Sequence, residues 1–388
     1  HRGWEERYGT ALRAGRRPFA NDRDPFRPLK VGFVSGDFGR HPVGYFTVST
    51  FAALDRDVLE LHCYSDRPHG GDDLTARIRA VVPHWRDTAA LPDALLAERI
   101  RADGIDILFD LAGHTAGNRL PVFARKPAPV QVSWAGYVGT TGLAAMDYVL
   151  ADRFHAPDDS GFVERVLRMP DGYVCYTPPE EAPAIGPLPA LTREHVTFGS
   201  FNAWAKVTAE VVALWSAILG DLPDSRLLLV GRWFNDARLR GRVRDAFAVH
   251  GIAAERLDLR GQVPHAELLA AYNEVDIALD PFPYSGGLTT CEALWMGVPV
   301  VTWPGRTFAG RHSLSHLSNV GLTESIAADL DSYRAIAGRL AGDLPHLAEL
   351  RAGLRPRMAA SPLCDAPRFA AAFAGVLRTA WAEWCATV

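Results

Sequence analysis

Short apolar runs, separated by segments of helix length, dominate the first half of the chain. Runs of this kind, rich in Val, Ile and Leu, are typical of strands in a parallel sheet that is covered on both faces. The pattern therefore predicts an α/β fold for this half. The predicted strands are LKVGFVS (29–35), LELHCYS (59–65), IDILFDL (105–111) and VQVSWA (130–135).

The second half repeats the strand and helix alternation more regularly. A repeated strand–helix order implies right-handed crossovers and one twisted parallel sheet, whose ligands bind beyond the carboxyl ends of the strands. We therefore predict a Rossmann-like nucleotide-binding domain here. Its expected elements are strands at 196–201, 226–231, 257–261, 277–280 and 298–303, and helices at 209–219, 236–250 and 265–273.

A proline-rich segment separates the two halves. TPPEEAPAIGPLPAL carries five prolines and no periodicity, which suits a linker between domains. The last residues show aromatic side chains near helical spacing, so this helix should pack back on a domain. The predicted organisation is an N-terminal domain at 1–180, a linker at 181–191, a C-terminal domain at 192–365 and a final helix at 366–388.

Composition narrows the function classes. A chain of 388 residues has enough length for two cores, and a net charge of -4 with scattered arginines argues against nucleic-acid binding. Five widely spaced cysteines without a CxxC pair predict neither disulfides nor a zinc ribbon, and favour the cytoplasm. No apolar run is long enough to span a membrane, and the N-terminal stretch does not resemble a secretory signal.

The densest chemical signal is the stretch DPFPYSGGLTTCEALWMG, where a strand ends in a glycine turn and a helix follows. Gly286 and Gly287 permit close approach of a ligand, and Thr289 and Thr290 open a helix whose free N–H groups favour a phosphate. Glu292, one turn into that helix, is placed to accept hydrogen bonds from a ribose. The alternative is an ordinary turn in which a threonine caps the helix.

The motif FNAWAK follows the first strand of the second domain. It places Asn202 and Lys206 where ligand-binding groups collect in an open α/β sheet. Lys206 can neutralise a departing diphosphate, although a lysine taken alone is more often a solvated surface residue.

Three strand ends in the first half carry polar and glycine residues. Asp37 and His41 follow the first strand and are candidates for handling a proton. The other two clusters are His114, Asn118 and Arg119 after the third strand, and GYVGTTG (136–142) after the fourth. Any one of these histidines is more often structural than catalytic, so the prediction depends on the three ends sharing one cleft edge.

His312 and His316, four residues apart, imitate a helical metal pair. No HExxH carboxylate accompanies them and no third ligand is placed by the sequence. We therefore expect no metal here, and interpret them as histidines of a helix surface or of an acceptor cleft.

Taken in order, these motifs resemble the catalytic region of the O-GlcNAc transferase family, in particular its bacterial, SPINDLY-like members. The matching stretches include VGFVSGDFGRHPVGYF, DILFDLAGHTAGNRLPVFARKPAPVQVSWAGYVGTTG, FGSFNAWAK and DIALDPFPYSGGLTTCEALWMGVPVVTWPG. The resemblance implies a GT-B fold of two facing Rossmann-like domains, with the acceptor on the N-terminal side and the nucleotide sugar on the C-terminal side. It implies an inverting, metal-independent enzyme that needs no cofactor and moves a sugar, with UDP-GlcNAc as the expected donor, to Ser or Thr hydroxyls of proteins.

The resemblance also assigns roles to individual positions. Lys206 matches the diphosphate-binding lysine, and Glu292 stands where the family has a ribose-binding Asp. His41 and Asp37 match residues proposed as bases, and His1 matches a further histidine of the family. The predicted substrate-binding residues are Asn202, Val263, His265, Gly286, Gly287, Leu288, Thr289, Thr290, Glu292, Ala135, Gly136, His114 and Arg311. Departures from the family pattern occur at Val138, Ala203, Leu288 and Glu292.

These departures leave the donor open. GDP-fucose or UDP-glucose is an alternative donor for the same fold, and a non-catalytic module that senses a sugar nucleotide is an alternative function. A nucleotide-sugar epimerase of the same architecture is disfavoured by the motifs of the first half. The expected partners are a nucleotide sugar, a protein or peptide acceptor and an upstream tetratricopeptide domain that these residues do not contain.

Overall fold

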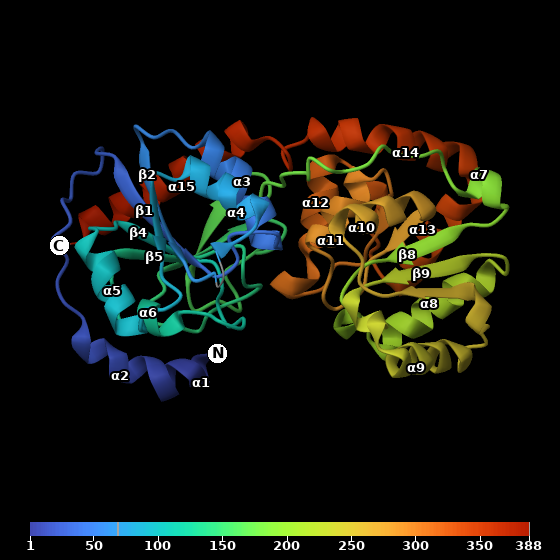
Figure 1. Cartoon of the computed structure of the whole chain (residues 1–388), viewed down its shortest axis with the longest axis horizontal. Coiled ribbons are helices and arrows are strands. Elements are labelled where there is room, and N and C mark those ends of the chain that lie inside the picture. Colours follow the sequence, from blue (N-terminus) through green and yellow to red (C-terminus); the bar gives the residue numbers. More distant parts are fainter. Residues whose placement is uncertain (68–69, 388) are drawn as a thin grey trace. The chain divides into compact units, whose positions relative to one another are not determined.

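A computed structural model describes residues 1–67 and 70–387 of the chain. The chain folds into two compact units, the first formed by His1–Thr177 with Pro362–Val388 and the second by Pro178–Ser361 (Figure 1). In this division the proline-rich residues 181–191 group with the second unit. The final helix groups with the first.

The first unit is built on a sheet of seven parallel strands in the order β3-β2-β1-β4-β5-β6-β7. The predicted parallel α/β architecture is confirmed, and the first two predicted strands have the predicted bounds. The strands are β1 (Leu29–Ser35), β2 (Leu59–Ser65), β3 (His84–Asp87), β4 (Ile107–Asp110), β5 (Val130–Ser133), β6 (Tyr148–Asp152) and β7 (Arg165–Met169).

Helices connect these strands, and the chain begins with a short irregular helical run. The last helix, α15 (Ala366–Ala386), packs on β5, β7 and α3. Its Phe373 ring lies 5.3 Å from that of Phe109 and 5.2 Å from that of Trp134, which confirms that the final helix packs back on the core. The other helices are α1 (Arg2–Trp4), a π-helix (Glu5–Gly9), α2 (Thr10–Leu12), a 3₁₀ turn (Arg13–Gly15), α3 (Pro42–Ala53), α4 (Asp73–Val81), α5 (Asp93–Ala102) and α6 (Leu120–Ala124).

The second unit contains five parallel strands in the order β10-β9-β8-β11-β12, as the regular alternation predicts. The strands are β8 (Thr197–Ser200), β9 (Arg226–Val230), β10 (Leu257–Arg260), β11 (Ile277–Leu279) and β12 (Val300–Val301). The α-helices are α7 (Ala190–Arg193), α8 (Ala209–Asp221), α9 (Ala237–Ala248), α10 (His265–Ala271), α11 (Leu288–Trp295), α12 (His312–Val320), α13 (Leu330–Gly342) and α14 (Leu344–Ala359). The 3₁₀ turns are η4 (Trp204–Lys206), η5 (Arg232–Asn235), η6 (Ala254–Arg256), η7 (Tyr272–Glu274), η8 (Phe308–Gly310) and η9 (Thr323–Ser325).

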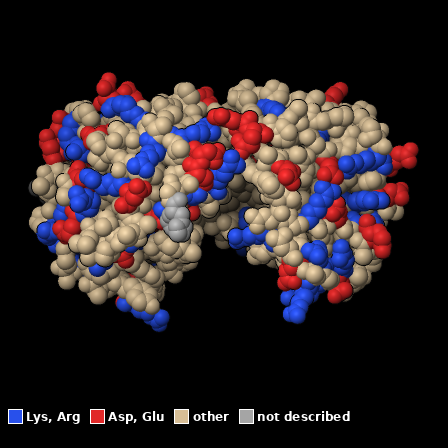
Figure 2. All heavy atoms as spheres, in the orientation of Figure 1, with Lys and Arg blue, Asp and Glu red and all other residues tan. Residues whose placement is uncertain are grey.

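The surface mixes charges of both signs. On the face drawn in Figure 2, basic and acidic side chains are interspersed over each unit. All five cysteines are free thiols. Among the helices of residues 1–67 and 70–387, none is long and apolar enough to cross a bilayer.

Candidate functional site

The start of α11 presents backbone N–H groups without a side-chain cap. Its N-cap residue is Gly287, which has no side chain to accept hydrogen bonds from them. Thr289 and Thr290 lie inside the helix, so the alternative of a capping threonine is wrong. Because these N–H groups have no partner within the helix and the helix dipole points toward them, this end of α11 favours an anion.

Two hydrogen bonds fix the glycine turn before α11. The N–H of Gly286 donates to Asp280 Oδ1 at 2.6 Å, and the Thr290 hydroxyl donates to the Gly286 carbonyl at 3.0 Å. A Cβ on Gly286 would lie 2.6 Å from the Thr290 hydroxyl and 2.7 Å from that of Thr289. A side chain at this position would therefore displace both threonine hydroxyls, including the one that donates to the turn.

Lys206 lies beside this turn, at the end of η4. Its ammonium Nζ donates to the Ser285 carbonyl at 2.9 Å and lies 4.0 Å from the centre of the Tyr284 ring. Asn202 connects it to the helix, because its Oδ1 accepts from Lys206 Nζ at 3.4 Å and from the Thr289 hydroxyl at 3.0 Å. Burial lowers the pKa of Lys206 to about 8, against the raising effect of Asp280. The structure thus brings together the predicted residues Asn202, Lys206, Gly286 and Thr289.

Asp280 and Tyr284 were not predicted as members of this site. Asp280 is buried at the end of β11, and its Oδ2 accepts from the Thr302 hydroxyl at 2.7 Å. Burial raises the pKa of this carboxyl to about 6. The Asp280 carboxylate thus positions the backbone of the glycine turn. In the sequence, the signal for this role was an aspartate directly after an apolar strand.

Glu292 and His265 form a pair. Glu292 Oε1 accepts from His265 Nε2 at 2.7 Å, and only 3% of Glu292 is exposed. The pair joins α11 to the start of α10, so the structure brings Glu292 to the predicted segment of Val263 and His265. Arg311 lies directly before α12 and donates to the Gly305 carbonyl at 3.0 Å.

In the first unit, His41 is the N-cap residue of α3. Its Nδ1 accepts a hydrogen bond from the Val43 N–H at 3.3 Å and lies 3.7 Å from Asp37 Oδ2. While Nδ1 accepts this bond, the proton of the neutral imidazole lies on Nε2. Burial lowers the pKa of His41, and the Asp37 charge opposes this effect. His41 is therefore neutral near pH 7 and presents a donor at Nε2.

The loop after β5 has an unusual backbone. Ala135 has a φ of 59°, a left-handed conformation that costs energy for a residue with a Cβ. At Gly136 a Cβ would lie 1.6 Å from the Leu111 carbonyl oxygen, so only glycine fits. Such strain is concentrated at functional sites, which supports the prediction of Ala135 and Gly136 as substrate-binding residues.

His114 and His1 pack against this same loop. His114 Nε2 donates to the Thr141 carbonyl at 2.7 Å, and its ring centre is 4.5 Å from that of His1 and 5.4 Å from that of Tyr137. The buried Glu164 holds the loop by accepting from the Thr141 N–H at 2.7 Å. A hydrogen bond thus fixes the His114 ring against the loop that contains Ala135 and Gly136.

The other candidate side chains either bond to groups of the protein itself or are buried. Arg119 forms ion pairs with Asp66 and Asp93 at 2.9 and 2.8 Å, so its guanidinium binds the protein's own carboxylates. Asn118 donates to the Thr115 carbonyl at 2.8 Å. His312 and His316 are 3% and 1% exposed, so the interpretation as surface histidines is wrong.

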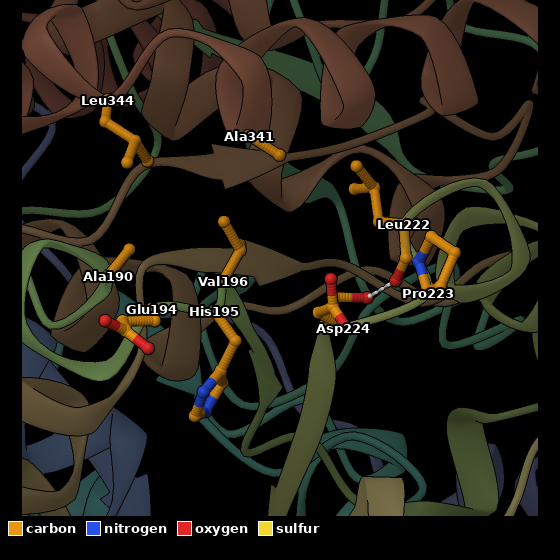
Figure 3. A pocket seen from close by; sticks show the side chains of 10 residues that line it. Ala190, Glu194, His195, Val196, Leu222, Pro223, Asp224, Ala341 and Leu344 are labelled. Carbon is orange, nitrogen blue, oxygen red and sulfur yellow. Dashed lines mark hydrogen bonds between the residues drawn. The ribbon is translucent and has the colours of Figure 1, made fainter.

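A separate pocket of about 270 Å³ lies in the second unit, around the residues before β8 and β9 (Figure 3). Its lining includes Val196, Leu222, Asp224 and Leu344, and none of the predicted site residues. Since Val196 and Ser225 directly precede their strands, this pocket lies at the amino ends. It is at the opposite end of the sheet from the start of α11.

Comparison with known proteins agrees with this geometry. The sequence profile of glycosyl transferase family 41 matches residues 15–176 and 188–373. The chain belongs to glycosyl transferase family 41. It is 39% identical to the probable UDP-N-acetylglucosamine–peptide N-acetylglucosaminyltransferase SPINDLY of Arabidopsis thaliana over 392 residues, which cover 99% of this chain and 43% of that protein.

Solved structures agree with the GT-B fold of this family 41 chain. A mutant O-GlcNAc transferase of Thermobaculum terrenum matches with a TM-score of 0.94 and 41% identity, covering 100% of this chain and 74% of the other. Sucrose-phosphate synthase of Thermosynechococcus elongatus, 13% identical, shares the fold with a TM-score of 0.54 over 92% of this chain and 100% of its own. The family 41 chain spans less than half the length of its SPINDLY relative.

Proposed function

We propose that this chain is the catalytic region of an enzyme that transfers GlcNAc from UDP-GlcNAc to Ser or Thr hydroxyls of proteins, with inversion and without a metal ion. The observation that carries the proposal is the uncapped start of α11 beside the desolvated ammonium of Lys206. The names of the family relatives support this donor and acceptor.

The donor would be held by the second unit. Its diphosphate fits the N–H groups of α11 and the Lys206 ammonium, which Asn202 orients. Glu292 with His265 offers hydrogen-bonding groups for the ribose, and the backbone near Val263 would contact the uracil. As UDP departs, the charge that develops on its phosphate would be stabilised by Lys206 and by the helix dipole.

The acceptor chemistry would use the first unit. The acceptor oxygen bonds to the anomeric carbon as the bond to the phosphate oxygen breaks, and the hydroxyl proton must leave. His41 presents a donor at Nε2 and would need the other tautomer to accept this proton, whereas the half-exposed Asp37 carboxylate can accept it through water. The donor phosphate is the third possible acceptor.

The protein acceptor would be presented by an upstream tetratricopeptide domain in the cytoplasm. This part of the proposal rests on the family and on the fraction of the SPINDLY relative that the chain spans. An active chain that modifies peptides but modifies intact proteins only when the upstream domain is attached would support it.

A donor panel tests the proposal. UDP-GlcNAc, UDP-glucose and GDP-fucose, each with a labelled sugar, are incubated in EDTA with a pool of Ser and Thr peptides and with wild type, Lys206→Met or Lys30→Met. We expect transfer from UDP-GlcNAc, lost in Lys206→Met and retained in the Lys30 control. Transfer from GDP-fucose alone would show that GDP-fucose, and not UDP-GlcNAc, is the donor. Nucleotide binding without transfer or hydrolysis would support the alternative of a non-catalytic module that senses a sugar nucleotide.

A further inference from the structure

Two histidines and a glutamate meet on the outer strands of the first sheet, apart from every residue assigned to the transfer reaction. His62 on β2 and His84 on β3 are register partners, and their rings stack at 4.2 Å. Glu60 precedes His62 by two residues and so lies on the same face of the strand. Glu60 Oε1 is 2.8 Å from His62 Nε2 and 3.0 Å from His84 Nε2.

This arrangement gathers three potential ligand atoms around the Glu60 carboxylate. We propose that Glu60, His62 and His84 form a binding site for a divalent transition metal of the zinc class. The three ligand atoms lie within 4.8 Å of one another, and two imidazoles with one carboxylate are a donor set that Zn²⁺ accepts. Zinc bonds of about 2.0 to 2.2 Å place tetrahedral ligands roughly 3.4 Å apart, so each His–Glu contact has to open slightly. The two rings are stacked at an interplanar angle of 14°, so the exposed His84 ring must also rotate for both Nε2 atoms to face one ion.

The burial of the three residues fits such a site. His62 is 6% exposed and fixed in the sheet, while the side chains of Glu60 and His84 are 37% and 49% exposed and can adjust. The Nε2 of His62 faces the cluster, 2.8 Å from Glu60 Oε1, whereas its Nδ1 is buried without a hydrogen-bond partner among residues 1–67 and 70–387. The exposed side leaves a fourth coordination position for water.

The surrounding charges permit a cation. An imidazole binds a metal through an unprotonated nitrogen, so metal binding at Nε2 of His62 and His84 would compete with protonation of these atoms. Arg86, two residues after His84 on the same face of β3, is paired with Asp103 at 2.6 Å. Its positive charge is therefore balanced by a carboxylate outside the cluster.

A bound ion would join the edge strand to the sheet. β3 is the terminal strand in the sheet order, and three of its four residues are exposed. A metal shared by β2 and β3 would stabilise the folded state in proportion to its binding, since the ligands do not converge in the unfolded chain. The transfer reaction itself would remain independent of this ion.

Untagged protein is stripped with EDTA, dialysed and titrated with ZnCl₂ by calorimetry, with thermal unfolding measured in parallel. We expect one equivalent that is lost or weakened more than roughly tenfold in His84→Ala and Glu60→Gln, and a rise in Tm of about 5 °C at saturation. His250→Ala, which removes an exposed histidine of the second unit, should bind as wild type does.

Equal Tm values of His84→Ala and wild type in EDTA would show that the variant folds. Failure of wild type to bind Zn²⁺, or equal binding by wild type and His84→Ala, would overturn the proposal.

Discussion

Replacement of Lys206 by Met should weaken nucleotide binding without weakening the fold. Met retains the length of the apolar stem and removes only the ammonium. A hydrogen bond to a charged partner contributes about 1.5 to 3 kcal/mol, which corresponds to a roughly 10- to 150-fold rise in the Kd for UDP. Calorimetry at pH 7 in EDTA measures this change, with Lys30→Met as the control.

The Lys206→Met variant should bind UDP more weakly and yet be no less stable than wild type. A pKa lowered from 10.5 to about 8 corresponds to about 3 kcal/mol that burial of the Lys206 charge costs the folded state. Because the folded pKa lies below the unfolded one, this cost is present below pH 8 and disappears as the pH rises toward 10.5. Urea unfolding at pH 7 should therefore show Lys206→Met to be as stable as wild type or more so.

Protonation of Lys206 also gives UDP binding a pH dependence. With a pKa of about 8 in the free protein, the charged fraction falls from about nine tenths at pH 7 to one tenth at pH 9. The Kd for UDP should rise roughly tenfold over this interval in wild type, and should remain flat in Lys206→Met. An unchanged Kd in the variant at pH 7, with or without a pH dependence, would refute the assignment of Lys206 to the diphosphate.

Two further substitutions test the first unit. In urea unfolding, Gly136→Ala should lower the unfolding free energy by at least about 2 kcal/mol, because its Cβ would meet the Leu111 carbonyl at 1.6 Å. The control Gly139→Ala, where a Cβ meets no atom within 4 Å, should be nearly neutral. Phe373→Ala should cost about 3 to 5 kcal/mol, because it removes a fully buried ring from the contact of α15 with the core, whereas Phe26→Ala at an 87% exposed position should change stability by less than about 0.5 kcal/mol. Equal effects within either pair would contradict the packing described here.

The apolar pattern predicted the buried strands and missed the exposed one. β1 and β2 are nearly continuous buried runs, so their bounds follow from the sequence. β3 has the sequence HWRD and is mostly exposed, so no apolar run marks it. Its pairing with β2 is a tertiary feature, and with it the cluster of Glu60, His62 and His84 could not be predicted from spacing.

The sequence predicted the parts of the site that lie within one local motif. A glycine turn followed by two threonines indicated the start of α11, and the structure places Lys206 and Asn202 beside it. The lowered pKa of Lys206 depends on burial in the fold, so the sequence could not predict it. The pairing of Glu292 with His265 likewise joins two helices that lie 27 residues apart in the sequence.

Hydrogen exchange with and without saturating UDP, in the absence of metal, tests the central claim most directly. We propose that the diphosphate binds the N–H groups at the start of α11, so exchange of the amides at 286–290 should slow. The amides of Leu222, Asp224 and Ser225, beside the pocket of Figure 3, should be unchanged. Protection of these amides without protection of 286–290 would contradict the assignment of the donor site.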